Sequence, residues 1–114
     1  MILRFASRRR FGYEWAHLQR PARLAGLDEA TIAAITAGDA PAALPHSSQA
    51  VLEAVDAVVQ QQSIPAEVQR RVVGAFGNRG MVEVVALCGL YGLMGDMVTA
   101  FDIPIEDGLP APSF

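Results

Sequence analysis

The segment from about Arg79 to Phe101 constrains the fold of this chain more than any other. It is apolar on nearly every side of a helix, and only Glu83 and Asp96 interrupt its apolar side chains. A helix that is apolar all round has to be buried all round, and a chain of 114 residues has little material with which to surround it. We therefore expect an all-α fold in which this helix lies near the centre of a homo-oligomer, with a dimer or trimer as the building block.

Small residues on this helix indicate how it packs. Gly89, Gly92 and Gly95 recur at intervals of three and predict a ridge that permits close helix approach. The longest uncharged apolar run, Val84–Gly95, is too short to cross a bilayer, so no membrane partner is expected.

Helix start and stop signals divide the rest of the chain into further helical segments and no strand. We expect one domain of about five helices over residues 1–114, followed by an irregular tail over residues 103–114, which holds three prolines. The expected helical segments are Met1–Arg10, Tyr13 to about Ala25, Glu29–Ala37 after an Asp28 cap, a helix opened by Ser47 or Ser48, a helix from Pro65 to a turn at Gly77-Asn78, and the apolar helix.

Charge and cysteine content limit the classes of function. Residues 1–23 hold six arginines and one acid, whereas the remainder holds three arginines and eleven acids. The basic start could meet a carboxylate substrate or an acidic neighbouring subunit; it is too short to favour nucleic acid. Cys88 is the only cysteine, which excludes an intrachain disulfide and fits a cytoplasmic protein. An Arg-rich mitochondrial presequence at Met1–Arg10 is the alternative.

Two segments carry a family resemblance. The first is Tyr13–His17 (YEWAH) followed by Arg23–Leu27 (RLAGL), and the second is Met81–Leu87 (MVEVVAL) with Gly89, Tyr91 and Ile103-Pro104. In this order and spacing they resemble the carboxymuconolactone decarboxylase-like family of the alkylhydroperoxidase D-like superfamily, over about Leu3 to Glu106. The resemblance implies a helical fold that assembles as trimers or hexamers, and cofactor-free decarboxylation of a small carboxylated lactone or ring compound by a carbon–carbon lyase.

The chain departs from the family pattern in three ways. It is shorter at the start than most members, so we expect an N-terminally truncated one. Phe11 and Glu14 occupy the positions of the Cys-x-x-Cys pair, so thiol peroxidase activity is not expected. The family's relay histidine would fall at Leu18, one residue after His17.

The candidate catalytic residues are Tyr13, Glu14 and His17, which share one helical face. Glu14 would orient His17 and raise its basicity, so that the pair moves a proton while Arg10 holds the substrate carboxylate. The structural alternative is a Glu–His–Tyr cluster in which Glu14 complements the helix dipole.

Other candidate residues complete the predicted site. Trp15 is either a substrate platform or a core residue. His46 is expected to cap or precede a helix, and it and His17 make no recognisable metal site. Glu83 is expected to pair with Arg70, Arg71 or another subunit. The two hypotheses for function are therefore a small acid/base lyase without cofactor or metal, and a non-catalytic oligomeric helical module.

Overall fold

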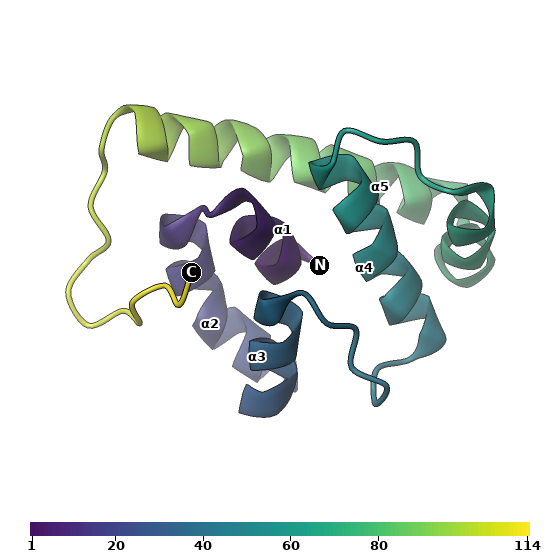
Figure 1. Ribbon diagram of the computed structural model, residues 1–114, viewed down its shortest axis with the longest axis horizontal. Helices are drawn as coiled ribbons and strands as arrows, with labels where there is room; N and C mark the ends of the chain where they lie inside the picture. Colours follow the sequence, from purple (N-terminus) through teal and green to yellow (C-terminus); the bar gives the residue numbers. More distant parts are fainter.

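The computed structural model describes residues 1–114 as five helices without strands, which confirms the all-α prediction (Figure 1). The helices are α1 (Ile2–Arg9), α2 (Gly12–Leu24), α3 (Glu29–Ala37), α4 (His46–Val59) and α5 (Ala66–Ala100). Residues 101–114 form an irregular tail, as the prolines predict.

The shortest helix, α1, lies in the middle of the molecule and contacts each of the other four (Figure 1). Leu3, Phe5 and Ala6 on α1 are almost completely buried. The core therefore forms around α1, where apolar side chains of α2 to α5 converge, and α5 runs along one side of it.

Local capping explains most of the helix ends. The Asp28 side chain accepts a hydrogen bond of 2.8 Å from the Thr31 amide, and Gly38 ends α3 with a φ of 108°, both as expected. The prediction that Ser47 or Ser48 opens α4 is wrong. This helix begins at His46 directly after Pro45, whose fixed φ of −53° favours a helix start without a side-chain cap.

Helix α5 consists of two segments that meet at Gly77. This glycine has φ 73° and ψ 177°, which a residue with a Cβ rarely adopts, so the expected turn at Gly77-Asn78 is confirmed. Pro65 lies immediately before the first helical residue, Ala66, rather than within the helix.

The second segment of α5 buries only a narrow face. Val84, Cys88, Gly92 and Gly95 point inward, whereas apolar side chains cover the opposite face in contact with solvent. The exposed fraction is 66% for Val82, 60% for Leu93 and 51% for Met97. The tail does not cover this face, because it folds back onto α2 (Figure 1).

The predicted glycine ridge is only partly correct. Gly92 and Gly95 face aromatic rings of the same chain: a Cβ at Gly92 would lie 3.5 Å from Phe5, and one at Gly95 would overlap Phe11. Gly89 faces open space. Gly92 and Gly95 therefore make room for aromatic side chains of the same chain rather than for a neighbouring subunit.

Length and composition also make α5 a candidate membrane span. An 18-residue window of Ala66–Ala100 has a mean hydropathy of 1.6, and 22% of that window is buried. The uncharged run Val84–Gly95 considered alone is shorter, because Glu83 and Asp96 limit it.

Within the chain, Glu83 pairs with neither Arg70 nor Arg71, contrary to expectation. Its carboxylate pairs with Arg79 one turn earlier, with a distance of 2.8 Å from Nε to Oε1, and both side chains are exposed. Arg71 instead pairs with Glu53 at 2.8 Å. Glu83 is thus an ordinary solvated helix charge.

Candidate functional site

Helix α2 carries most of the predicted site residues, but it presents them to three different surroundings. Trp15 faces α3, Glu14 faces the end of α5, and Tyr13 and His17 face the tail. The shared helical face expected from their spacing therefore does not bring all of them to one place.

Glu14 lies in an unusual environment for a carboxylate. Its exposed fraction is 4%, and neither carboxylate oxygen has a hydrogen-bond partner. Burial raises the pKa of Glu14 to about 7; the negative charge of Asp96 adds to this effect and Arg9 opposes it. Glu14 can therefore gain and lose a proton near neutral pH.

Glu14 lines a small pocket of about 210 Å³ between the start of α2, the end of α5 and the first tail residues. Its remaining lining residues are Phe11, Gly12, Tyr13, Gly95, Val98, Thr99, Asp102, Ile103 and Ile105. Asp102 holds a left-handed backbone with φ 50° where the chain leaves α5. Five of the ten lining residues are apolar, so the pocket is about half apolar and half polar.

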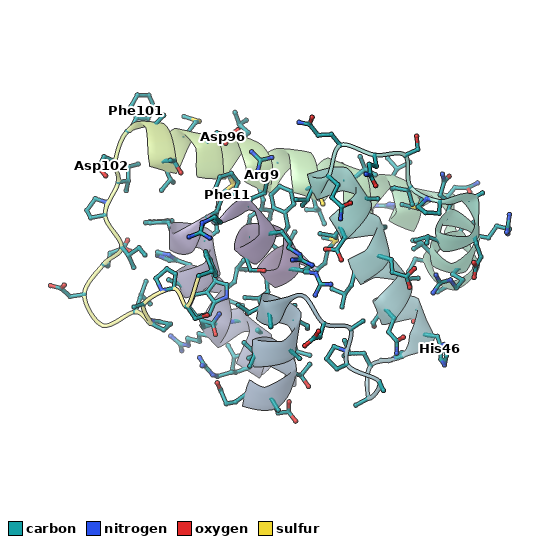
Figure 2. The ribbon with its side chains drawn as sticks, viewed as in Figure 1. Arg9, Phe11, His46, Asp96, Phe101 and Asp102 are labelled. Atoms are coloured by element: carbon teal, nitrogen blue, oxygen red, sulfur yellow. The ribbon has the colours of Figure 1, made fainter.

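A cation lies close to this pocket. The Arg9 guanidinium is 3.3 Å from Oδ1 of Asp96 and 4.9 Å from the centroid of the Phe11 ring, and Figure 2 labels Arg9 and Phe11 close to Asp96 on α5. Arg9 offsets part of the negative charge near Glu14 without bonding to it.

The carboxylate that contacts His17 belongs to Glu106, not to Glu14. Nε2 of His17 is 3.1 Å from Oε2 of Glu106, and the Tyr13 hydroxyl donates to Oε1 of Glu106 at 3.1 Å. The rings of Tyr13 and His17 stack with centroids 4.2 Å apart. Tyr13 and His17 thus contact the carboxylate of Glu106 in the tail, and the predicted cluster with Glu14 does not form within the chain. The pKa of Glu106 is lowered by its own backbone N–H and then by Tyr13 and His17.

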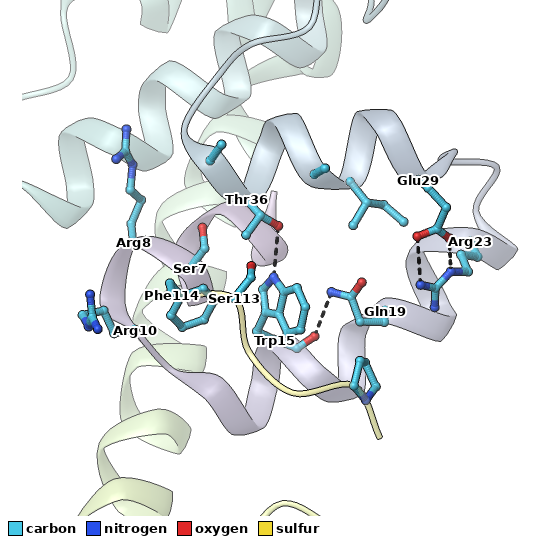
Figure 3. A pocket seen from close by; sticks show the side chains of 14 residues that line it. Ser7, Arg8, Arg10, Trp15, Gln19, Arg23, Glu29, Thr36, Ser113 and Phe114 are labelled. Carbon is cyan, nitrogen blue, oxygen red and sulfur yellow. Dashed lines mark hydrogen bonds and ion pairs between the residues drawn. The ribbon is translucent and has the colours of Figure 1, made fainter. Parts of the chain in front are cut away.

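The two residues predicted to bind substrate, Arg10 and Trp15, line one pocket of about 620 Å³ (Figure 3). This pocket lies between α2, α3 and the end of the tail, and it shares no lining residue with the pocket of Glu14. Trp15 is buried, its indole N–H donates to Oγ1 of Thr36 at 3.0 Å, and its ring meets the edge of Phe114.

Sequence reasoning missed the ion pair between Arg4 and Asp56. Arg4 is 3% exposed, and its Nε and Nη2 each donate to the Asp56 carboxylate at 2.8 Å. An arginine inside the apolar stretch Ile2–Ala6 was the available signal.

The other ionisable groups offer little chemistry. No three His, Cys, Asp or Glu side chains come together as metal ligands. Burial raises the pKa of the Cys88 thiol, which disfavours the reactive thiolate. His46 is exposed as the first residue of α4.

No family model, curated protein or solved structure matches this chain.

Proposed function

We propose that this chain transfers a proton to or from a small carboxylated ring compound, as a cofactor-free decarboxylase or a related acid/base catalyst, with Glu14 as the proton carrier. The observation that carries the proposal is the burial of both Glu14 oxygens without a partner at the wall of a pocket. An acid whose pKa lies near the working pH is the most effective general acid or base.

In decarboxylation, the bond between the carboxylate and the ring carbon breaks, and its electron pair stays on the ring. Protonated Glu14 then donates its proton to that carbon, and water restores the acid. The apolar half of the pocket solvates a charged substrate carboxylate poorly, which favours loss of carbon dioxide. A volume of about 210 Å³ suits one small ring rather than a drug-sized ligand.

Tyr13 and His17 take secondary parts in this proposal. Tyr13 forms a wall of the Glu14 pocket, and His17 stacks on Tyr13 while it contacts Glu106. His17 is thus a positioning residue. Arg10 and Trp15 lie outside this pocket and do not bind the substrate here.

The experiment measures carbon dioxide release from a panel of carboxylated lactones, carboxymuconolactone included. Glu14→Gln keeps the side-chain shape and removes the titrating proton, so turnover should fall by roughly a hundredfold or more. With Glu14 as the acid, the rate should also decline as the pH rises above about 7. Glu53→Gln, on an exposed part of α4, is the matched control.

A direct titration separates the site from the choice of substrate. The Glu14 carboxyl signal, followed by ¹³C NMR against pH, should titrate near 7. An ordinary glutamate titration, or equal turnover in wild type and Glu14→Gln, would contradict the proposal.

A second candidate is a non-catalytic helical module that assembles with a second copy of itself. The exposed apolar face of α5 favours it, since Val82, Leu93 and Met97 recur along one side and Gly89 leaves open space between them. Exposed apolar surface costs roughly 25 cal/mol per Å². Small residues at the middle of the face permit two copies of α5 to approach closely.

Light scattering at low micromolar concentration tests this candidate. Wild type should be a dimer or larger, and Leu93→Glu should dissociate it, whereas Glu14→Gln should not. A monodisperse wild-type monomer would defeat self-association. Co-flotation with phosphatidylcholine vesicles would instead assign the face to a bilayer.

A further inference from the structure

The pocket beside Trp15 has no role in the proposed function. Its volume is about 620 Å³, and it has no lining residue in common with the Glu14 pocket. Figure 3 shows Arg8 and Arg10 at one end, the Arg23–Glu29 pair at the other, and Trp15 between them. A molecule in this pocket would therefore meet positive charge beside an aromatic surface.

The arginines of this pocket differ in their partners. Arg23 is held by both carboxylate oxygens of Glu29, and Nε of Arg8 lies 3.5 Å from Oδ1 of Asp56. Arg10 makes no side-chain hydrogen bond or ion pair, although it lines the same pocket. One guanidinium is therefore free to take a ligand.

The backbone at Arg10 forms the C-cap of α1. Arg10 has φ 58° and ψ 33°, a left-handed conformation at the end of α1 that glycine adopts more readily than any residue with a Cβ. No contact of the Arg10 side chain within the chain accounts for an arginine there. The Arg10 and Phe11 N–H groups donate to the carbonyls of Ser7 and Ala6, so helix capping explains this backbone, and the Arg10 side chain lines the pocket.

Two aromatic rings in the pocket offer surface to an apolar ligand body. The indole N–H of Trp15 is already bonded to Thr36, so Trp15 offers only apolar surface. The Phe114 ring meets Trp15 edge-on with centroids 5.8 Å apart, and Ile32 lies on the same wall. A free guanidinium that lines the same pocket as two aromatic rings matches a planar anion with a ring.

We propose that this pocket binds a small aromatic carboxylate, whose charged group accepts two hydrogen bonds from the Arg10 guanidinium while its ring lies against Trp15 and Phe114. Arginine presents two parallel N–H donors to a carboxylate, which gives both affinity and orientation. This site is distinct from the Glu14 pocket, and the proposal does not depend on catalysis there.

The sole tryptophan, Trp15, provides the measurement. Benzoate should change its emission saturably, and calorimetry should give the same dissociation constant. Benzyl alcohol, which has the ring without the charge, should bind at least tenfold more weakly. Inorganic phosphate tests the charge without the ring and should bind more weakly than benzoate.

Arg10→Gly separates ligand binding from folding. Glycine suits the left-handed backbone, so the unfolding midpoint should stay the same or rise, while the benzoate dissociation constant should increase at least tenfold. Arg20→Gln, an exposed arginine outside the pocket, is the control and should leave both values unchanged.

Three outcomes would overturn the proposal. The first is equal affinity for benzoate and benzyl alcohol, and the second is unchanged benzoate affinity in Arg10→Gly. The third is no benzoate binding to wild type at about 20 mM, a concentration that would reveal even a dissociation constant of about 1 mM. Glu14→Gln should bind benzoate normally, so a failure of the proposed acid/base function leaves this result intact.

Discussion

Two buried charged side chains, Arg4 and Glu14, are treated in opposite ways by this fold. The Arg4 guanidinium makes five hydrogen bonds, to the Asp56 carboxylate and to the carbonyls of Ile35, Gly38 and Asp39. The two oxygens of Glu14 make none. Both side chains are less than 5% exposed, so burial alone does not distinguish them.

The difference indicates that Arg4 serves the structure, whereas Glu14 is available for proton transfer. Arg4 joins α1 to the end of α3 and to α4, and its positive charge lies beside carbonyls at the C-terminus of α3, where the helix dipole favours it. The Glu14 carboxylate makes no hydrogen bond to another element and lies beside a pocket. An unsatisfied buried carboxylate destabilises the fold, so the residue has to be explained by something other than stability.

The largest effect is expected at Arg4. Arg4→Met keeps the length of the side chain but leaves Asp56 and three carbonyls without their main donor, so the free energy of unfolding should fall by about 3–5 kcal/mol. Urea denaturation measures this loss. The control, Arg20→Met, should change stability by less than about 0.5 kcal/mol, because Arg20 is exposed and has no ion pair.

A loss below about 1 kcal/mol for Arg4→Met would mean that the network only balances its own desolvation. The contrast with Glu14 would then disappear, since neither charge would support the fold.

A smaller effect, of opposite sign, is expected at Glu14. Its pKa rises from 4.5 to about 7 on folding, so wild type should lose stability as the pH increases from about 4.5 to 7 and stay level above that. Glu14→Leu should abolish this dependence. At pH 8 the variant should be more stable than wild type by roughly 3 kcal/mol, and near pH 4.5 the two should be similar.

Thermal unfolding at several pH values measures this difference, with Glu53→Gln as the control that keeps the wild-type pH dependence. If Glu14→Leu were less stable than wild type at pH 8, Glu14 would have a favourable partner after all. The distinction from Arg4 would then be one of degree.

The smallest effect is expected at Glu106, whose carboxylate is exposed and paired. Glu106→Gln should shift the thermal midpoint by less than about 3 °C, because solvent screens an exposed ion pair. A shift as large as that of Arg4→Met would show that the tail contributes to the core.

Local patterns predict the helices of this chain well, because caps and breakers act over a few residues. Asp28, Gly38 and Gly77 mark boundaries through hydrogen bonds and φ values that belong to their own neighbourhood. The apolar excess of α5 was also visible, because exposed Val82 and Leu93 follow from too little covering chain.

The arrangement of the site could not be predicted in the same way. Helical spacing places Glu14 and His17 near one another, but it does not say that the tail would supply Glu106 to His17 while the end of α5 covers Glu14. Arg4 was missed for the same reason, since Asp56 lies 52 positions further along the chain. Contacts between distant segments decide which neighbouring side chains meet.

The folded-back tail also affects the order in which contacts form during folding and break during unfolding. The bond between Tyr13 and Glu106 joins positions 93 residues apart, so it closes a long loop and gains little energy in return. We therefore expect this hydrogen bond to form after the helices have assembled and to break before they separate. Phe114 lies in the same tail and contacts Trp15, so we expect the emission of this tryptophan to report a fast, local opening of the tail that far-UV circular dichroism does not register. The fluorescence of Trp15 is thus an intrinsic probe for the movement of the tail.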